Sequence, residues 1–329
     1  MSASNPIPLV SVCTIAYNRE KFITQAIESV LMQQTTFAYE LVIGEDCSTD
    51  GTRAIVADYQ QRYPDKIRAV FHEKNLGIHK NYAVTITACR GKYIAFLDAD
   101  DYWTDPLKLQ KQVDYLEAHP EYSGSAHRSE VVDENGERTH LYPCYFEKHD
   151  LNLADSIAIS SPWQTSCFLC RRALLVLPAW DYSLTGFDLL VFMVIASKGK
   201  IRFFPEIMSA YRCYPGGATS SAKFADQLHL SYLKVMDRFD DYLQGRCHDK
   251  IDYVRAYHRR RILSRLIEQG DFRAAHVHAK ELLGYNLRHC CFDDSGRLLR
   301  IIFRGSCPRL WQLVHKSKNA VFPSPIPPA

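Results

Sequence analysis

The sequence predicts an α/β fold, in which a mixed, Rossmann-like sheet is flanked by helices and is followed by a C-terminal helical subdomain. The first hundred residues alternate short apolar runs with helical patterns, which is the rhythm of βαβ units. The run at 93–97 is wholly apolar, as expected for a strand that is covered on both faces. Beyond residue 217 the chain turns helical, with the last expected helix ending at residue 283.

The individual elements follow from the spacing of the apolar residues. Strands are expected at 9–15, 40–44, 67–72 and 93–97, with helices between them at 19–32, 52–63 and 78–89. From 122 to 172 the pattern changes to shorter strands with turn signals such as Asn135-Gly136. The rest of the pattern predicts a helix at 187–197, strands at 201–204 and 207–214, and helices at 224–244, 251–269 and 272–283.

The length of 329 residues suits one large domain with a smaller appendage. We expect a main domain over 1–221, a helical subdomain over 222–290, and a basic amphipathic segment with a proline-rich, disordered end over 291–329. A hydrophobic content of 47% and a charged content of 23% are those of an ordinary globular protein, which excludes fibrous and disordered classes.

Composition and termini predict a cytoplasmic protein. The first eight residues have neither the basic start nor the apolar run of a secretory signal, and the longest apolar stretches reach about half of the ~20 residues that a membrane span needs. The eleven cysteines are odd in number and scattered, which favours reduced thiols. A net charge of +3 is too small to predict a nucleic-acid partner.

The positive charge is concentrated at the C-terminal end. No acidic residue follows Asp294, and the segment 297–318 carries six Arg and Lys residues among large apolar ones such as Phe303 and Trp311. This composition predicts either peripheral docking on the anionic, inner face of the cytoplasmic membrane or packing of the apolar residues on the helical subdomain.

Polar clusters follow three of the expected strands, where parallel sheets bind their ligands. These clusters are Tyr17-Asn18-Arg19, Glu45-Asp46 and Asp98-Ala99-Asp100-Asp101. Three carboxylates within four residues repel one another unless a cation neutralises them. Oxygen ligands favour Mg²⁺ or Mn²⁺, which proteins often hold with one or two carboxylates while phosphate oxygens complete the shell. The alternative is a solvated acidic turn that caps the next helix.

The motifs resemble those of inverting family 2 glycosyltransferases of the GT-A fold, over about residues 7–221. They are VSVCTIAYN at 10–18, EDCSTDGT at 45–52, NLG at 75–77 and GKYIAFLDADD at 91–101. The resemblance implies an enzyme that moves a sugar from a nucleotide-diphosphate donor, most commonly a UDP-sugar, to an acceptor hydroxyl with inversion. The expected acceptor is a saccharide or a lipid-linked saccharide in cell-surface polysaccharide or glycan synthesis.

The resemblance also implies a role for each matching residue. The nucleobase and ribose pocket would be lined by Thr14, Ala16 and Tyr17. An acid of the pair Glu45 and Asp46 would accept a hydrogen bond from the base, Asp98 would hold ribose or sugar hydroxyls, Asp100 would ligate the metal, and Lys80 would face the nucleotide. Arg212 would contact phosphate, or else form a surface salt bridge.

The catalytic base of such enzymes lies at the start of a later helix. Gly186-Phe187-Asp188 fits this pattern, so Asp188 is the expected base, with Asp181 as the reserve candidate. Two other classes stay open, a catalytically inactive nucleotide-sugar or glycan-binding relative and a nucleotidyltransferase. The latter is expected to carry a Gly-rich, basic loop after the first strand, where this chain has Tyr17-Asn18-Arg19.

Overall fold

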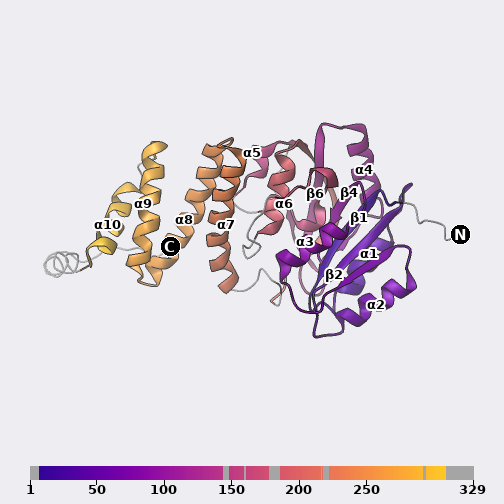
Figure 1. The fold of residues 1–329 in the computed structure, drawn as a ribbon. Helices are drawn as coiled ribbons and strands as arrows, with labels where there is room; N and C mark the ends of the chain where they lie inside the picture. Colours follow the sequence, from indigo (N-terminus) through magenta and orange to yellow (C-terminus); the bar gives the residue numbers. More distant parts are fainter. Residues whose placement is uncertain are drawn as a thin grey trace. The chain divides into compact units, whose positions relative to one another are not determined.

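A computed structural model describes residues 7–143, 148–158, 161–177, 186–215, 217, 222–291 and 294–308. The chain divides into two compact units, Met1–Ala225 and Asp226–Ala329 (Figure 1). Asp181 and the segment 309–329, which includes Trp311, lie outside the described residues. None of the helices in the described ranges combines the length and the apolar character that a membrane span needs.

The first unit is built on a ten-stranded mixed sheet whose main path has the order β3-β2-β1-β4-β9-β6-β10-β5. The strands on this path are β1 (Val10–Ala16), β2 (Tyr39–Glu45), β3 (Ile67–Phe71), β4 (Tyr93–Phe96), β5 (Tyr102–Trp103), β6 (Tyr122–Val132), β9 (Leu169–Arg171) and β10 (Lys200–Arg212). Off the path, β7 (Arg138–Tyr142) pairs with β6 and β8 (Asp150–Leu151) pairs with β10. The expected mixed sheet is confirmed.

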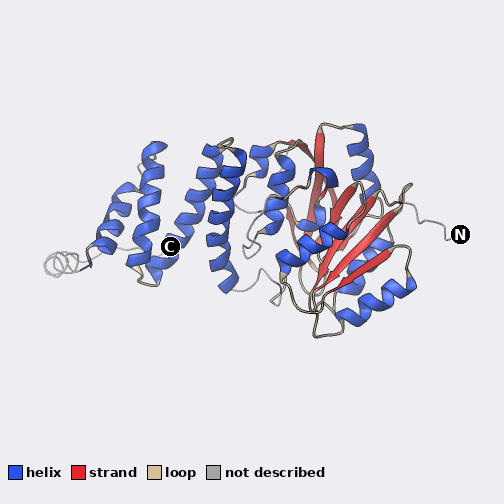
Figure 2. Cartoon of the chain, viewed as in Figure 1, coloured by secondary structure: helices blue, strands red, loops and turns tan. Residues whose placement is uncertain are grey.

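Helices cover both faces of this sheet (Figure 2). The helices of the first unit are α1 (Ile23–Leu31), α2 (Thr52–Arg62), α3 (Ile78–Ala88), α4 (Lys108–Ala118), α5 (Leu153–Ser156) and α6 (Phe187–Ala196), with short 3-10 turns at Thr165–Cys167 and Arg172–Leu174. One core cluster joins α1, α2 and α4 to alternate residues of β4, namely Tyr93 and Ala95. Phe96 points to the other face, where it packs near Tyr82 of α3. This alternation follows from the two-residue period of a strand.

The parallel part of the sheet determines where the functional groups meet. β1 pairs in parallel with β2 and with β4, so all three carboxyl ends lie at one edge of the sheet. Gly44 of β2 lets α3 approach closely, because a Cβ there would lie 2.0 Å from the Thr85 hydroxyl. The Asn81 side-chain amide donates to the Gly44 carbonyl at 2.8 Å and fixes α3 over the strand.

The second unit is helical in the part that the structure describes. It contains most of α7 (Ala222–Leu243), then α8 (His248–Glu268), α9 (Phe272–Arg288) and α10 (Ser295–Ser306). Its apolar core includes Ala256, Leu282, Leu298 and Ile301, which are contributed by α8, α9 and α10. The predicted C-terminal helices are therefore present, and the described part of the basic segment forms a further helix that packs with them.

The structure differs from the expected elements at two points. The helix expected at 19–32 begins at Ile23, because Asn18 has a positive φ of 53° and the loop turns before the helix starts. The two strands expected at 201–204 and 207–214 form one strand, β10, with a shift in register between Phe204 and Ile207. Proline lacks the N–H that a ladder needs, so Pro205 accounts for the local irregularity.

Candidate active site

The loops after β1 and β2 are held together at the carboxyl edge of the sheet. The Asp46 backbone N–H donates to the Ala16 carbonyl at 2.9 Å. The Asn18 side-chain oxygen accepts from the Thr49 backbone N–H at 2.8 Å, and the Asn18 N–H donates to the Ser48 hydroxyl at 3.0 Å. The polar clusters predicted after β1 and β2 are thus hydrogen-bonded to each other.

The acids Glu45 and Asp46 both have protein partners. Glu45 is buried, accepts from the Ser48 N–H at 2.7 Å and pairs with Arg53 at 2.9 Å. The Asp46 carboxylate accepts from the backbone N–H groups of Leu76 at 2.7 Å and Gly77 at 3.0 Å. Glu45 therefore holds the loop between β2 and α2, and Asp46 holds the loop that leads into α3. Which of the two acids contacts a base stays a prediction.

The residues expected to line the nucleoside pocket differ in exposure. Thr14 and Ala16 are buried in β1, and the Thr14 hydroxyl has no hydrogen-bond partner among the described residues. Tyr17 is 41% exposed, so its ring is accessible for stacking on a base. Lys80 is exposed on the first turn of α3, where its charge is free to reach a phosphate. Their roles in donor binding stay predictions.

Burial and mutual repulsion raise the pKa values of two acids in the turn after β4. Asp98 accepts a short hydrogen bond from the Tyr82 hydroxyl, and burial, together with the charges of Asp100 and Asp188, raises the pKa of Asp98 to about 7. Burial and the charges of Asp100 and Asp98 also raise the pKa of Asp101. A nearby cation would stabilise the ionised form of both buried acids.

Asp100, the third residue to consider in this turn, accepts hydrogen bonds from an arginine and a tyrosine. Its Oδ2 accepts from Arg19 Nε at 2.9 Å and from the Tyr214 hydroxyl at 3.1 Å. Burial and the Asp100 charge raise the pKa of Tyr214 to about 12, so this hydroxyl keeps its proton and donates at neutral pH. Arg19 therefore balances the Asp100 charge in this structure.

The acidic turn fits a metal that is shared with a diphosphate. Within the described ranges, no three His, Cys, Asp or Glu side chains converge as a ligand set. A Mg²⁺ or Mn²⁺ ion bound with a diphosphate needs only one or two carboxylates, which Asp100 can supply. Burial is the main cause of the raised pKa values of Asp98 and Asp101, and the Asp100 charge adds to it, so a bound cation would favour the ionised form of both acids.

Arg212 lies beside the acidic turn but its guanidinium is already engaged. It is buried, and it donates to the Asp100 carbonyl at 3.0 Å and to the Gln25 side chain at 2.7 Å. It also donates to the carbonyl oxygens of Asp133 and Glu134 at 3.2 and 2.9 Å. This geometry favours a structural role in positioning the turn over either the phosphate contact or the surface salt bridge expected from the sequence.

Asp188 lies on the first turn of α6 and is near the acidic turn. Gly186, the residue before the helix, has a φ of 100°, a left-handed conformation that favours glycine. A helix N-terminus favours a negative charge, and the Ser161 hydroxyl donates to Asp188 Oδ2 at 2.8 Å. Tyr82 donates to Asp98 and lines the same pocket as Asp188, so a single side chain connects the two acids.

Three residues of this site had no role in the sequence prediction. Tyr82 bonds Asp98, Ser161 bonds Asp188, and Tyr214 bonds Asp100. No local motif marks Ser161, since it meets Asp188 only through the fold. Tyr214 lies two positions after Arg212, a residue that the sequence did assign to the donor site.

Solved structures of similar fold are GT-A glycosyltransferases. Residues 1–349 of S. aureus TarS in complex with UDP align with a TM-score of 0.64 at 18% identity, over 97% of this chain and 94% of that one. The mannosyltransferase PcManGT from Pyrobaculum calidifontis, in complex with GDP-Man and Mn²⁺, aligns with a TM-score of 0.53 at 14% identity, over 92% of this chain and 88% of that one. The class of fold is therefore GT-A.

Sequence comparison defines the family. The profile of glycosyl transferase family 2 matches residues 11–175, and the chain belongs to this family. An uncharacterized protein of Mycobacterium tuberculosis is 35% identical over 216 residues, which are 65% of this chain and 61% of that protein. TuaG of Bacillus subtilis, named as a glycosyltransferase of teichuronic acid biosynthesis, is 39% identical over 109 residues, 33% of this chain and 42% of TuaG. The chain thus spans about three-fifths of the first of these relatives.

Proposed function

We propose that this chain transfers a sugar from a nucleotide-diphosphate donor, with UDP as the expected nucleotide, to an acceptor hydroxyl with inversion. The observation that supports the proposal most directly is the position of Asp98 and Asp100 after β4, where Tyr82 donates to Asp98 and also lines the pocket that Asp188 borders. Family membership favours glycosyl transfer over the nucleotidyl transfer that the motifs left open. The complexes of TarS with UDP and of PcManGT with GDP-Man support a nucleotide-sugar donor.

Asp188 is the proposed general base. It takes the proton of the acceptor hydroxyl as that oxygen forms a bond to the anomeric carbon, while the bond from this carbon to the diphosphate oxygen breaks. The nucleoside diphosphate leaves with the electron pair, and a single displacement inverts the anomeric centre. Ser161 keeps the carboxylate oriented through its hydrogen bond to Oδ2.

Asp100 is the proposed ligand of Mg²⁺ or Mn²⁺. A divalent ion held there would stabilise the charge that develops on the departing diphosphate. The Mn²⁺ in the PcManGT complex supports this choice of ion. Arg19 and Tyr214 hold the same carboxylate in this structure, so they are placed to keep it oriented before a donor arrives.

The proposed acceptor is a saccharide or a lipid-linked saccharide of cell-surface glycan synthesis. The name of TuaG, which refers to teichuronic acid biosynthesis, supports this class of acceptor. Peripheral docking at the cytoplasmic membrane face belongs to the same proposal, because α10 presents Arg297, Arg300 and Arg304 on its exposed surface. A cationic surface of this kind is attracted to anionic lipid.

The stabilisation of the protein by UDP and Mn²⁺ tests the donor site. We expect UDP with Mn²⁺ to raise the midpoint of thermal unfolding, UDP in excess EDTA to raise it far less, and Asp100→Ala to lose the metal-dependent part, because Asp100 and the diphosphate share the ion. Asp58→Ala, at an exposed surface acid, is the control and should behave like wild type. Equal stabilisation with and without metal would contradict the shared site.

A further inference from the structure

A small apolar pocket lies beside the proposed base. The enclosed part has room for about one group of the size of a water molecule or a methyl, and the whole hollow, with open solvent included, measures about 200 Å³. Among the described residues, its walls are the rings of Tyr82, Phe96, Phe187 and Phe192 together with Val191. Thr165 and Asp188 are the other residues that line it.

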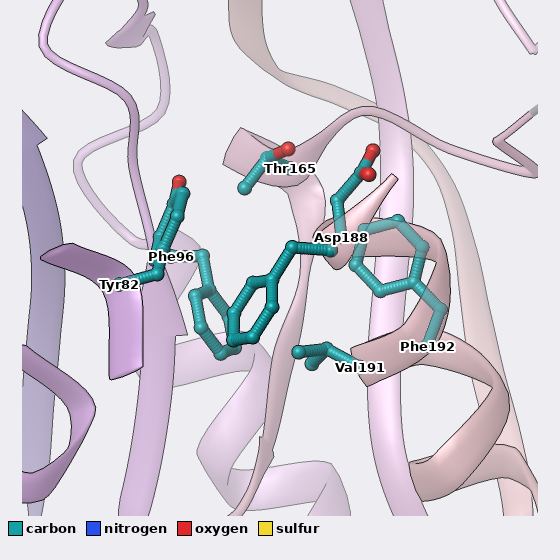
Figure 3. Close-up of a pocket in the computed structure, with 7 residues that line it drawn as sticks. Tyr82, Phe96, Thr165, Asp188, Val191 and Phe192 are labelled. Carbon is teal, nitrogen blue, oxygen red and sulfur yellow. The ribbon is translucent and has the colours of Figure 1, made fainter. Parts of the chain in front are cut away.

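The polar groups of the pocket are gathered at one edge. Figure 3 shows the hydroxyls of Tyr82 and Thr165 and the carboxylate of Asp188 along this edge, while Phe96, Val191 and Phe192 lie deeper. Val191 is 2% exposed and Phe192 is 1% exposed, so the deeper part has an apolar surface. A hydroxyl placed there would lose its hydrogen bonds to water and find no partner among these side chains.

The pocket is lined by Asp188, and it is separated by one side chain, Tyr82, from Asp98, the other carboxylate that the proposed function places near the transferred sugar. Tyr82, one of its walls, donates to Asp98. Asp188, at the edge, also influences the ionisation of Tyr82, since it helps to raise the pKa of that phenol after burial and Asp98. A group that enters this pocket is therefore part of the sugar that is moved, or lies directly against it.

Ring packing fixes the walls in advance. Tyr82 stacks on Phe187 with ring centroids 5.6 Å apart, and Phe192 packs edge-on against Phe168 at 4.8 Å. Trp163, which is fully buried, closes this cluster at 5.3 Å from Phe192. Preformed apolar walls need little rearrangement to enclose a methyl group.

We propose that this pocket selects a donor whose sugar carries a methyl group, as an acetamido substituent or as a 6-deoxy carbon. This inference rests on the proposed glycosyl transfer and names its class of sugar. The accessible lining of the pocket is apolar, and the rings and Val191 enclose the methyl group. An apolar pocket discriminates by about 10- to 200-fold for a group of this size.

Matched sugar nucleotides test the proposal by their dissociation constants. The probes are UDP-glucose, UDP-N-acetylglucosamine and UDP-6-deoxyglucose in Mn²⁺, measured by calorimetry on the full chain, with UDP alone as the reference. We expect one methyl-bearing donor to bind at least about tenfold more tightly than UDP-glucose, and the donor that does so identifies the source of the methyl group. If UDP binds but the three sugars bind within threefold of one another, the pocket proposal is overturned while donor binding stands.

Variants at Val191 connect the preference to the pocket. Val191→Leu fills the cavity and should reduce the preference to about twofold or less, with UDP affinity unchanged. The same change at Val176, which is 68% exposed, should leave the preference intact. Should the Leu variant fail to fold, Val191→Ala is expected to weaken the methyl-bearing donor severalfold and to spare UDP-glucose. A preference that survives both changes contradicts the proposal, and a chain that binds neither UDP nor any donor contradicts the proposed function as well.

Discussion

At the scale of single residues, Asp188 carries the proposed proton transfer. Its position on the first turn of α6 depends on the left-handed Gly186 before it, and its orientation depends on Ser161. The preceding segment 178–185, which includes the reserve candidate Asp181, lies outside the described residues. The structure therefore supports Asp188 by its neighbours, and a substitution has to test its role.

Replacing Asp188 by Asn is expected to leave donor binding intact and to lower turnover by about a hundredfold or more, the usual contribution of a general base. The amide keeps the size of the side chain but cannot take a proton. The measurements are steady-state turnover and calorimetric affinity for the donor. Turnover within a few-fold of wild type would reject Asp188 as the base and direct attention to Asp181.

Lys108 is a fully buried lysine in α4, away from the acidic turn. Its ammonium donates to Gln112 Oε1 at 2.7 Å and lies 4.2 Å from the centre of the Trp103 ring. Burial lowers the pKa of Lys108 to about 7, although Cys167 and Asp105 oppose the shift. His127, also buried, lies close enough for the Lys108 charge to contribute to its lowered pKa.

Because the pKa of Lys108 is lowered in the folded protein, we expect the free energy of unfolding to depend on pH. Between pH 7 and its unfolded pKa of about 10.4, the unfolded chain binds more protons at this site than the folded chain, so the free energy of unfolding rises with pH in that window. In Lys108→Met this contribution is absent. We expect wild type to gain about 2 kcal/mol over the variant between pH 7 and 9 in urea unfolding. The exposed Lys250→Met is the control, and an identical pH slope in all three proteins would contradict the burial argument.

At the scale of elements, α10 is most of the part of the basic segment that the structure describes. Its residues are compatible with both predictions for this segment, packing on the helical subdomain and docking on a membrane. Leu298 and Ile301 are buried in the core of the second unit, as the packing alternative predicted. Leu299 is 54% exposed, and Arg297 and Arg300 are exposed as well, as membrane docking requires. One face of the helix therefore stabilises the unit and another is accessible to a partner.

The accessible face predicts binding to anionic vesicles. Replacing Arg297 and Arg300 together by Ala should weaken binding to phosphatidylserine-containing liposomes by about 30-fold, since each Arg contributes about 1 kcal/mol near such a surface. The matched control replaces Arg261 and Arg273, which are exposed on α8 and α9. Co-sedimentation at low and high salt measures the effect. Equal losses in both pairs would indicate unspecific charge attraction, and no binding by wild type would reject docking.

The sequence predicted the presence of strands and helices better than it predicted the residues at which they begin and end. The apolar pattern located β1 to β4 and α1 to α3, because β1, β2 and β4 are nearly continuous buried runs and the helices between them bury residues at helical spacing. It placed the start of α1 too early, since the turn at Asn18 depends on hydrogen bonds to the loop after β2. It divided β10 at Pro205, whereas pairing with β6 continues past the irregularity. The start of α1 and the continuity of β10 both depend on contacts between residues that are distant in sequence.

At the scale of the whole molecule, the motifs predicted the edge of the sheet where the site lies. Parallel pairing of β1 with β2 and β4 brings their acidic and polar ends together, and this follows from fold class alone. The partners of those acids could not be predicted in the same way. Arg19 donates to Asp100 although the two residues are 81 positions apart in sequence. The hydrogen bond from Arg212, beside the acidic turn, to Gln25 spans 187 positions, and such pairs are visible only in the folded chain.

Release of nucleoside diphosphate from a sugar nucleotide tests the proposed enzyme activity most directly. Purified protein is incubated with UDP- and GDP-linked sugars and Mn²⁺, with and without saccharide acceptors, and free nucleoside diphosphate is quantified. We expect acceptor-stimulated release from at least one donor, dependent on the divalent ion and lost in Asp100→Ala. Release that is as fast in EDTA, or in Asp100→Ala, would contradict the metal site, and binding of donor without any release across the acceptors would show a binding protein in place of a transferase.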